Sequence, residues 1–435
     1  MATDQLTSDP AVRTSRDMMT LLATGYAPRD FSVRFWDGSR LEPDPGNVAL
    51  FTLVLNHPGA LKKMLWPPDG VAFAEAYVYG DFDIEGDIFA FFRFTQFLIK
   101  KKPGVRELWN VFAGLLRLPS VNRERTGHQP VRLTGRKHSL ERDKQAVGYH
   151  YDLSNEFFGL WLDENMVYTC AYFADAAESI DAAQTRKLDY VCRKLRLKPG
   201  ERLLDIGCGW GALIMHAAKH YGVEAVGVTL SQRQVDLANE RIERAGLKGR
   251  CRAEYRDYRE IDEAGGFDKI ASIGMLEHLG ESQMPTYFRA ALRLLKPGGV
   301  FLNHVITLRA NTPFPKWTNF ARKYVFPDGE LRPLTVCLRE AESAGFEVRD
   351  VESLREHYAL TLERWVRRLE ARHEEVNRAS DETTFRVFRL YLAGARAGFL
   401  SGVYNLHQQL LAKPDGGDAR LPLTRADWYA GERGV

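Results

Sequence analysis

Cysteine, long apolar runs and net charge are all scarce in this chain. Only five of its 435 residues are cysteines, no two of them form a CxxC pair, and no histidine cluster accompanies them. We therefore expect neither a disulfide framework nor a metal site. No stretch approaches the roughly 18 to 20 apolar residues that span a bilayer, which excludes a polytopic membrane protein. The net charge is only +3, so bulk binding of nucleic acid is not expected.

The remaining composition is that of a globular protein with more than one domain. Apolar residues make up 45% of the chain and charged residues 27%. A length of 435 residues exceeds one ordinary domain. The first residues, 1–17, are polar and lack the apolar core of a secretory signal, so we expect a cytoplasmic location.

The pattern along the chain predicts a small N-terminal α/β domain followed by a linker. In the predicted domain, 1–118, a strand-like piece over 31–36 ends at the turn signal Asp37-Gly38. Residues 119–147 are polar and basic, which indicates an exposed linker.

The third region, 148–435, alternates strands with helices. This alternation predicts a parallel sheet that is covered on both faces. Residues 360–412 look mainly helical. The predicted strands cover residues 202–206, 225–229, 269–273 and 299–302.

A glycine-rich turn after the first of these strands is the strongest local signal. Residues 203–211 read LLDIGCGWG, in which a strand runs into a turn and then a helix. The GxGxG spacing is neither a phosphate loop nor the dinucleotide pattern GxGxxG. Asp205, before the first glycine, suits a ligand that bears an ammonium group. The alternative is a tight turn around a buried aspartate. The motif resembles the first motif of class I S-adenosylmethionine-dependent methyltransferases.

Further segments narrow the resemblance to one family. Five further segments, together with DIGCGWG, resemble the cyclopropane fatty-acyl-phospholipid synthase family, which includes the mycolic acid cyclopropane synthases. The match covers about 148 to 410, and the N-terminal region resembles the extra domain of the phospholipid-type members. The resemblance implies an α/β fold: a Rossmann-like domain with a mostly parallel seven-stranded sheet, and a smaller N-terminal α/β domain. The segments are YHYDLSNEFF at 149–158, MVYTCAYF at 166–173, VTLSQRQ at 228–234, SIGMLEHLG at 272–280 and LNHVIT at 302–307.

The resemblance also implies two ligands, S-adenosylmethionine and a bicarbonate ion beside its methyl group. Members of most related families end the second strand with an acidic residue for the ribose, whereas this chain has Thr229 there. By motif position, the bicarbonate ligands are Cys170, Glu277, His304, the backbone at Ile306, and Tyr358. The cofactor contacts are Tyr168, Thr169, Asp205, Gly207, Gly209, Thr229, Gln234 and Tyr258, whose ring could pack on the adenine.

The chemistry gives a reason for these residue types. An isolated alkene is a poor nucleophile, so it needs a strongly electrophilic methyl group held close by. Methyl transfer leaves a carbocation, which requires a dry pocket and a base for the new methyl group. Aromatic faces such as Tyr172, Phe173 or Trp210 could stabilise the cation.

Each site residue also has a structural interpretation. Cys170 could be a small buried apolar residue, and Glu277 could belong to a capped loop. His304 could be a core histidine whose hydrogen bonds are satisfied, and Tyr358 could serve packing alone.

Two interpretations remain open for the apolar and basic segments. The phenylalanines of 89–97, with Lys100–Lys102 and the basic linker, could dock on anionic headgroups. The same phenylalanines could instead form the core of the small domain. The stretch 380–412 could line an acyl channel or form a dimer contact, and the resemblance implies a homodimer.

We interpret the chain as a peripheral enzyme at the inner face of the plasma membrane. It would transfer a methyl group from S-adenosylmethionine to the cis double bond of a phospholipid acyl chain and close a cyclopropane ring. Loss of a different proton would give a 10-methylene or 10-methyl chain instead. A methyltransferase that acts on an amine or hydroxyl group and a non-catalytic lipid-binding protein are the rival interpretations.

Overall fold

A computed structural model describes residues 9–122, 124–151, 153–264, 266–313 and 318–429, and it divides the chain into two units. The first unit contains residues 1–129, 314–325 and 381–397, and the second contains 130–313, 326–380 and 398–435. The chain therefore returns to the first unit twice after leaving it.

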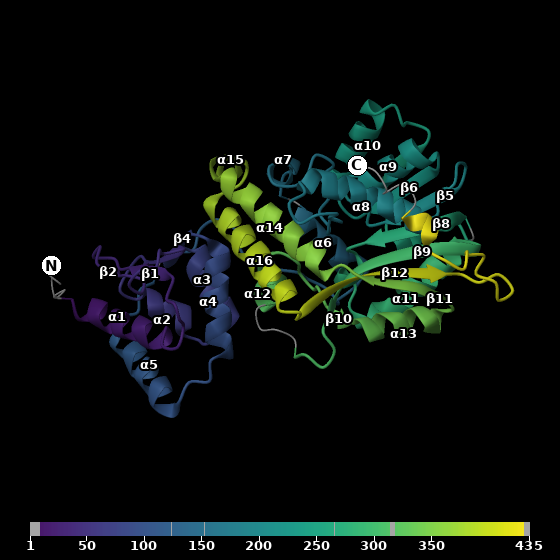
Figure 1. The fold of residues 1–435 in the computed structure, drawn as a ribbon. Coiled ribbons are helices and arrows are strands. Elements are labelled where there is room, and N and C mark those ends of the chain that lie inside the picture. Colours follow the sequence, from purple (N-terminus) through teal and green to yellow (C-terminus); the bar gives the residue numbers. More distant parts are fainter. Residues whose placement is uncertain (1–8, 123, 152, 265, 314–317, 430–435) are drawn as a thin grey trace. The chain divides into compact units, whose positions relative to one another are not determined.

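The first unit is built on a four-stranded sheet (Figure 1). The strand predicted at 31–36 is confirmed as β1, and Gly38 adopts φ +85° in the turn that follows. β1 is parallel to β3, whereas the two outer pairs are antiparallel. In the sheet order β2-β1-β3-β4, the strands are Arg40–Leu41, Phe31–Arg34, Phe51–Leu55 and Phe82–Gly86.

Two helices from distant parts of the sequence complete this unit. The guanidinium of Arg389 in α16 donates to the Tyr77 hydroxyl and to the carbonyl of Ile84, each at 3.0 Å. α16 comes from the stretch that we expected to line an acyl channel or form a dimer contact. The helices of the unit are α1 (Pro10–Leu22), α2 (Ala60–Leu65), α3 (Gly70–Val78), α4 (Ile88–Lys100), α5 (Val105–Arg117), α12 (Thr318–Tyr324) and most of α16 (Glu382–Leu400).

The phenylalanines of α4 form the core of the first unit. Phe89, Phe91, Phe92 and Phe94 are buried, and the Phe94 ring lies 4.6 Å from that of Phe31. The core interpretation is therefore confirmed, and these rings are not available for docking. Across the described part of the chain, no helix combines the length and apolar character needed to cross a bilayer.

The second unit contains the predicted Rossmann-like sheet. Its seven ordered strands are parallel except for β12, and the four strands predicted from the sequence are confirmed as β5, β6, β8 and β9. A short strand, β10 (Arg332–Pro333), adds to β9. In order across the sheet, the strands are β11 (Glu347–Ser353), β12 (Tyr404–Ala412), β9 (Leu295–Leu308), β8 (Phe267–Ile273), β5 (Arg202–Ile206), β6 (Glu224–Thr229) and β7 (Cys251–Tyr255).

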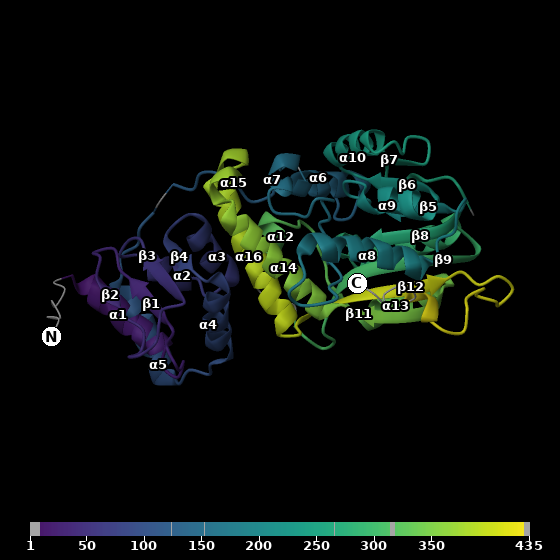
Figure 2. The ribbon, with the colours of Figure 1, turned by 45° about the horizontal axis from the view of Figure 1, so that its top comes forward.

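Helices cover both faces of this sheet. α8 (Ile180–Leu195), α9 (Ala212–Tyr221) and α10 (Gln232–Arg244) pack on one face, and α11 (Met284–Leu294) and α13 (Leu334–Ala344) pack on the other. Figure 2 shows α8 lying across β9 and β12. The remaining helices are α6 (Leu140–Tyr151), α7 (Asn155–Gly159), α14 (Arg355–Ala371) and α15 (His373–Ala379).

Two segments differ from the sequence-based expectation. The mainly helical interpretation of 360–412 is wrong for Tyr404–Ala412, which forms β12. This segment is a strand because it fills the slot between β9 and β11, where both of its edges are hydrogen-bonded. The stretch expected to be a linker is not a loop throughout, since α6 begins at Leu140.

Candidate active site

The glycine turn lies at the carboxyl end of β5, where ligands of open α/β sheets bind. The backbone N–H groups of Gly207 and Cys208 both donate to the carbonyl of Val228, at 2.9 and 3.1 Å. Gly207 has φ +86°, and an added Cβ would lie 3.2 Å from the Met275 side chain. Gly209 is also left-handed, with φ +53°. The turn therefore depends on glycine both for its backbone and for its close approach to the next loop.

A buried lysine connects this turn to the segment that contains Thr169 and Cys170. Burial lowers the pKa of Lys187 to about 8, although the carboxylates of Asp163 and Asp205 oppose the shift. Its ammonium group donates to Oγ1 of Thr169 at 3.0 Å. Burial raises the pKa of Asp205 to about 7, and the charge of Lys187 opposes that shift.

The end of β6 carries a neutral polar pair in place of the acidic residue found in related families. The Thr229 hydroxyl donates to Oε1 of Gln234 at 2.7 Å, and it accepts the N–H of Ser231 at 3.3 Å. Thr229 and Gln234 are both buried. The structure thus brings together the two residues that the sequence indicated for this position.

Tyr258 lies in the apolar core. Its ring meets that of Tyr287 edge to face, with centroids 5.6 Å apart, and burial raises the pKa of its hydroxyl. The neighbouring Asp257 carboxylate accepts from the Arg259 guanidinium at 2.7 and 2.8 Å. The structural role of Tyr258 is therefore clear, whereas its contact with adenine stays a prediction.

The loop after β8 is fastened to β9 at two points. The N–H of Gly274 donates to the carbonyl of His304 at 2.9 Å, and Oε1 of Glu277 accepts the N–H of Ile306 at 2.8 Å. Burial raises the pKa of Glu277 to about 7, although the N–H of Ile306 opposes the shift. Oε2 of Glu277 and Nε2 of His304 are buried and make no hydrogen bond within the described chain.

The Cys170 side chain and the backbone N–H of Tyr358 both contact the carbonyl of Leu354. The Cys170 sulfur lies 3.9 Å from the Leu354 carbonyl, to which the N–H of Tyr358 donates at 3.1 Å. Burial raises the pKa of the Cys170 thiol, so this residue is not poised as a thiolate nucleophile.

Strand β12 connects the segments of Cys170 and Tyr358 with the contact between Glu277 and Ile306. The N–H of Leu354 donates to the carbonyl of Leu406 at 2.9 Å, and Leu406 lies opposite Ile306 in the sheet. A continuous path of contacts thus runs from Cys170 to Glu277. The segments that carry the five residues are therefore linked through the sheet, and the convergence of their side chains on one anion site stays a prediction.

Gln408 and Lys194 determine which ring nitrogen of His304 carries a proton. Lys194 donates to Oε1 of Gln408 at 2.9 Å, and lysine has no acceptor atom, so this end of the amide is its oxygen. The amide nitrogen then faces Nδ1 of His304 at 3.2 Å and donates to it. Burial, with the charges of Lys187 and Lys194, holds the pKa of His304 well below its usual range. The ring is therefore neutral, and its proton resides on Nε2.

Sequence reasoning missed Lys187, Lys194 and Gln408. The two lysines lie seven residues apart on the buried face of α8, so their signal was a pair of cations on a mostly apolar helix face. Gln408 gave no signal because its segment was interpreted as helical.

Aromatic side chains surround Tyr168, and most of them were also missed. The Tyr168 ring lies 5.2 Å from Trp161 and 5.3 Å from Trp365, and the Tyr358 ring lies 6.1 Å from Trp365. Trp161 and Trp365 are fully buried. Tyr168 and Tyr358, predicted from separate motifs, therefore flank the same tryptophan.

The aromatic residues suggested for cation stabilisation lie in different places. Trp210 is 5.2 Å from Phe158, a neighbour of Tyr168, and its indole N–H donates to Oδ1 of Asn155 at 2.8 Å. Tyr172 instead stacks between Tyr190 and His357, at 4.4 and 4.8 Å.

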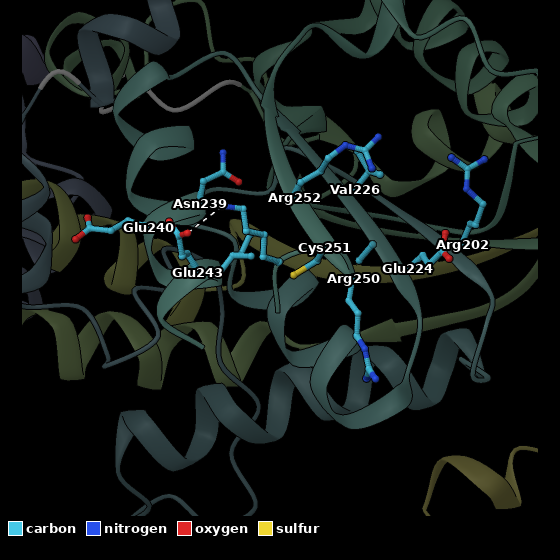
Figure 3. A pocket seen from close by; sticks show the side chains of 13 residues that line it. Arg202, Glu224, Val226, Asn239, Glu240, Glu243, Arg250, Cys251 and Arg252 are labelled. Carbon is cyan, nitrogen blue, oxygen red and sulfur yellow. Dashed lines mark hydrogen bonds and ion pairs between the residues drawn. The ribbon is translucent and has the colours of Figure 1, made fainter. Parts of the chain in front are cut away.

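A hollow of about 590 Å³ lies at the other end of the sheet (Figure 3). Arg202, Glu224 and Cys251, at the amino ends of β5, β6 and β7, contribute to its lining. Its charges are largely paired, as between Lys248 and Glu243 at 2.9 Å. None of the predicted site residues lines it.

Profiles of two known families match the chain. The profile of the mycolic acid cyclopropane synthetase family matches residues 138–409. A second profile, a domain of unknown function, matches residues 20–96 in the first unit.

Individual proteins and structures agree with the family match. A probable fatty acid methyltransferase of Pseudomonas putida is 36% identical over 91% of this chain and 95% of its own length. The cyclopropane-fatty-acyl-phospholipid synthase of Escherichia coli is 38% identical over 65% of this chain and 72% of its own length. A crystal structure of a mycolic acid cyclopropane synthase complexed with SAH and CTAB has a TM-score of 0.59 and 34% identity, covering 62% of this chain and 97% of that one.

Proposed function

Because the chain belongs to the mycolic acid cyclopropane synthetase family of S-adenosylmethionine-dependent methyltransferases, we propose that it acts on the cis double bond of a phospholipid acyl chain. In this proposal the transferred methyl group becomes the methylene of a cyclopropane ring. The observation that carries it is the pair of buried, unbonded atoms, Oε2 of Glu277 and Nε2 of His304, in the unit that also holds the aromatic cluster around Tyr168.

The carboxyl edge of the sheet fits the cofactor. S-adenosylmethionine, when bound, supplies the electrophilic methyl group. The turn at Gly207 lets the backbone approach a ligand closely, and Asp205 offers a carboxylate to an ammonium group. Thr229 and Gln234 would hold the ribose hydroxyls, since their mutual hydrogen bond fixes both side chains beforehand.

The Glu277–His304 pair fits a small oxyanion such as bicarbonate. Bicarbonate, when bound, supplies the base for the proton of the new methyl group. The neutral His304 presents Nε2–H as a donor, and Glu277, with a pKa of about 7, can hold a proton on Oε2 while Oε1 accepts from Ile306. Cys170, Tyr358 and the backbone at Ile306 would complete the site.

The aromatic cluster suits a reaction that passes through a carbocation. Trp161 and Trp365 are fully buried on either side of the half-buried Tyr168 ring, and this apolar surface excludes water that would quench the cation. Their ring faces also attract positive charge without acting as nucleophiles. A methyltransferase for an amine or hydroxyl group would not need this combination.

The same site could release a methylene-branched product. The cation is shared by both routes, and the position of the base decides which proton leaves. This second candidate is favoured by the Pseudomonas relative, which matches nearly the whole chain and is named for fatty acid methylation without reference to a ring.

Expression in a host whose lipids carry oleoyl chains tests the proposal. Fatty acid methyl esters should gain one CH₂ group in mass spectrometry, and proton NMR should show ring rather than alkene signals. A branched alkene would support the second candidate. No mass gain in any lipid background would overturn the enzyme assignment to acyl chains.

We also propose a location and an assembly for the protein. A substrate within a bilayer requires the enzyme to bind peripherally, at the inner face of the plasma membrane for a cytoplasmic protein. A homodimer is the assembly that the family resemblance supports, and light scattering tests it.

A further inference from the structure

Helix α5 has two apolar faces, and only one of them is covered. Leu115 and Gly114 face inward, where an added Cβ on Gly114 would lie 2.5 Å from the Met18 sulfur. The opposite face carries apolar residues at positions i, i+3, i+4, i+7 and i+11, which form one stripe on a helix. These exposed residues are Val105, Leu108, Trp109, Phe112 and Leu116.

The stripe continues onto the end of α2. The Phe112 ring lies 6.0 Å from that of Trp66 and 6.0 Å from that of Trp109. The two tryptophans are 54% and 66% exposed, respectively. We call Trp66 together with the five stripe residues the α5 patch. A contiguous exposed surface of this kind marks an interaction site rather than ordinary surface variation.

Unpaired cations border the α5 patch. Lys100, Lys102, Arg106 and Arg117 are exposed and form no ion pair within the described residues. The acidic residue of the helix, Glu107, is partly buried and paired with Lys101. The patch therefore combines tryptophans with a positive border, which is the pattern of a helix lying in the interface of an anionic membrane.

We propose that the α5 patch docks the protein on an anionic phospholipid surface. Its aromatic rings would enter the headgroup region, where tryptophan places an apolar body and a polar N–H. The lysines and arginines at its border would contact lipid phosphates. The choice of lipid as the partner rests on the proposed function as well as on this charge. α5 lies at the edge of its unit (Figure 1). The residues of the α5 patch are exposed and are not part of the buried core formed by α4.

Vesicle sedimentation tests the docking surface directly. We expect the intact chain to bind vesicles of dioleoyl phosphatidylglycerol and dioleoyl phosphatidylcholine, and to bind less tightly as salt rises. The double variant Trp109→Ser, Phe112→Ser should bind about tenfold more weakly. The charge variant Lys102→Gln, Arg106→Gln should lose affinity mainly at low salt.

Val48→Ser is the matched control. Val48 is 81% exposed in another part of the same unit, so its replacement also removes surface apolar area, yet it should leave vesicle binding unchanged. All altered residues are exposed, so circular dichroism should show intact folding. Equal binding by the double variant and the intact chain would overturn the proposal.

Two further measurements separate this inference from its competitors. If the double variant broke a dimer in light scattering and kept its vesicle affinity, the patch would be a contact between copies of the chain, and the proposal would be wrong. Methyl transfer to detergent-dispersed dioleoyl phosphatidylglycerol should survive the double substitution, while transfer to vesicles should fall. Because sedimentation needs no turnover, patch-dependent binding without any methyl transfer would uphold docking and reject the proposed reaction.

Discussion

The side-chain amide of Gln408 lies 3.2 Å from Nδ1 of His304, directly across the β12–β9 pairing. Because Lys194 occupies the oxygen end of that amide, the imidazole can only accept at Nδ1. The position of the proton on the His304 ring is thus decided by Gln408 and Lys194.

Gln408→Glu should reverse this pattern. A carboxylate accepts from Nδ1–H, and burial keeps the ring neutral, so the proton should move away from Nε2. Loss of that donor should lower kcat roughly 100-fold with little change in the KM for S-adenosylmethionine. Nitrogen-15 NMR of the histidines would show the exchange of tautomers.

Gln409→Glu is the control for this substitution. Gln409 is equally buried in the same strand, but its amide oxygen accepts from Asn303. It should reduce stability without changing the His304 signals. An unchanged His304 spectrum in Gln408→Glu would contradict the tautomer assignment.

Glu277→Gln should lower turnover by roughly 100-fold or more while cofactor binding stays near normal. The reason is that glutamine cannot hold or release a proton at the position of Oε2. Single-turnover kinetics and calorimetric titration with S-adenosylhomocysteine measure the two effects. Glu281→Gln, in the same loop but half-buried and paired with Arg332, should leave both values unchanged. A large loss of cofactor affinity in Glu277→Gln would refute the assigned role.

The same carboxyl group should make stability depend on pH. Its pKa is about 7 in the folded chain against a reference value of 4.5, so the folded state keeps a proton that the unfolded state releases between these values. This contribution is fully present below about pH 4.5 and is lost as pH rises through 7. The free energy of unfolding, relative to that of Glu277→Gln, should therefore fall by at most about 3 kcal/mol from pH 4.5 to 8. Urea titrations at several pH values measure it, and a rise over that interval would contradict the assignment.

Trp161→Ala should destabilise the second unit strongly. Its indole is fully buried among aromatic rings, so truncation should cost about 3 to 5 kcal/mol. Trp66→Ala, at an exposed position, should change the free energy of unfolding by less than about 0.5 kcal/mol. Similar losses for the two substitutions in denaturant titrations would argue against the aromatic core.

Thr361→Val tests how α14 holds the segment around Cys170. The Thr361 hydroxyl accepts the N–H of Ala171 at 3.0 Å, and valine would leave that buried N–H unbonded, at a cost of about 1 to 3 kcal/mol. Thr185→Val, on the exposed surface of α8, serves as the control and should be nearly neutral. Thermal unfolding of the two variants distinguishes a specific bond from the general effect of losing a hydroxyl.

The local parts of the site could be predicted because their signals are local. The strand and turn around Asp205 follow from a short apolar run and closely spaced glycines, and the structure shows both. The placement of Glu277 against Ile306 followed from family motifs, since no periodicity links residues so far apart.

The predictions that failed concern segments whose structure depends on residues far away in the sequence. Residues 408–412 are buried on both faces of the sheet, so the two glutamines and the apolar residues there do not alternate as in a half-buried strand. Its identity as β12 is set by pairing with residues about a hundred positions earlier. α5 presents the opposite difficulty, because two apolar faces in one helix do not reveal which one the unit buries.

Because the chain returns twice to the first unit, the protein cannot be divided into its two units by one cut in the sequence. α12 and the greater part of α16 belong to that unit although they follow long stretches of the second. A catalytic fragment that starts near residue 130 would keep these helices but lose the residues they pair with, such as Glu75 for Tyr324 and Asp83 for Arg386. The N-terminal region is thus not a detachable module: exchanging it between relatives would require transplanting three separate pieces of sequence together.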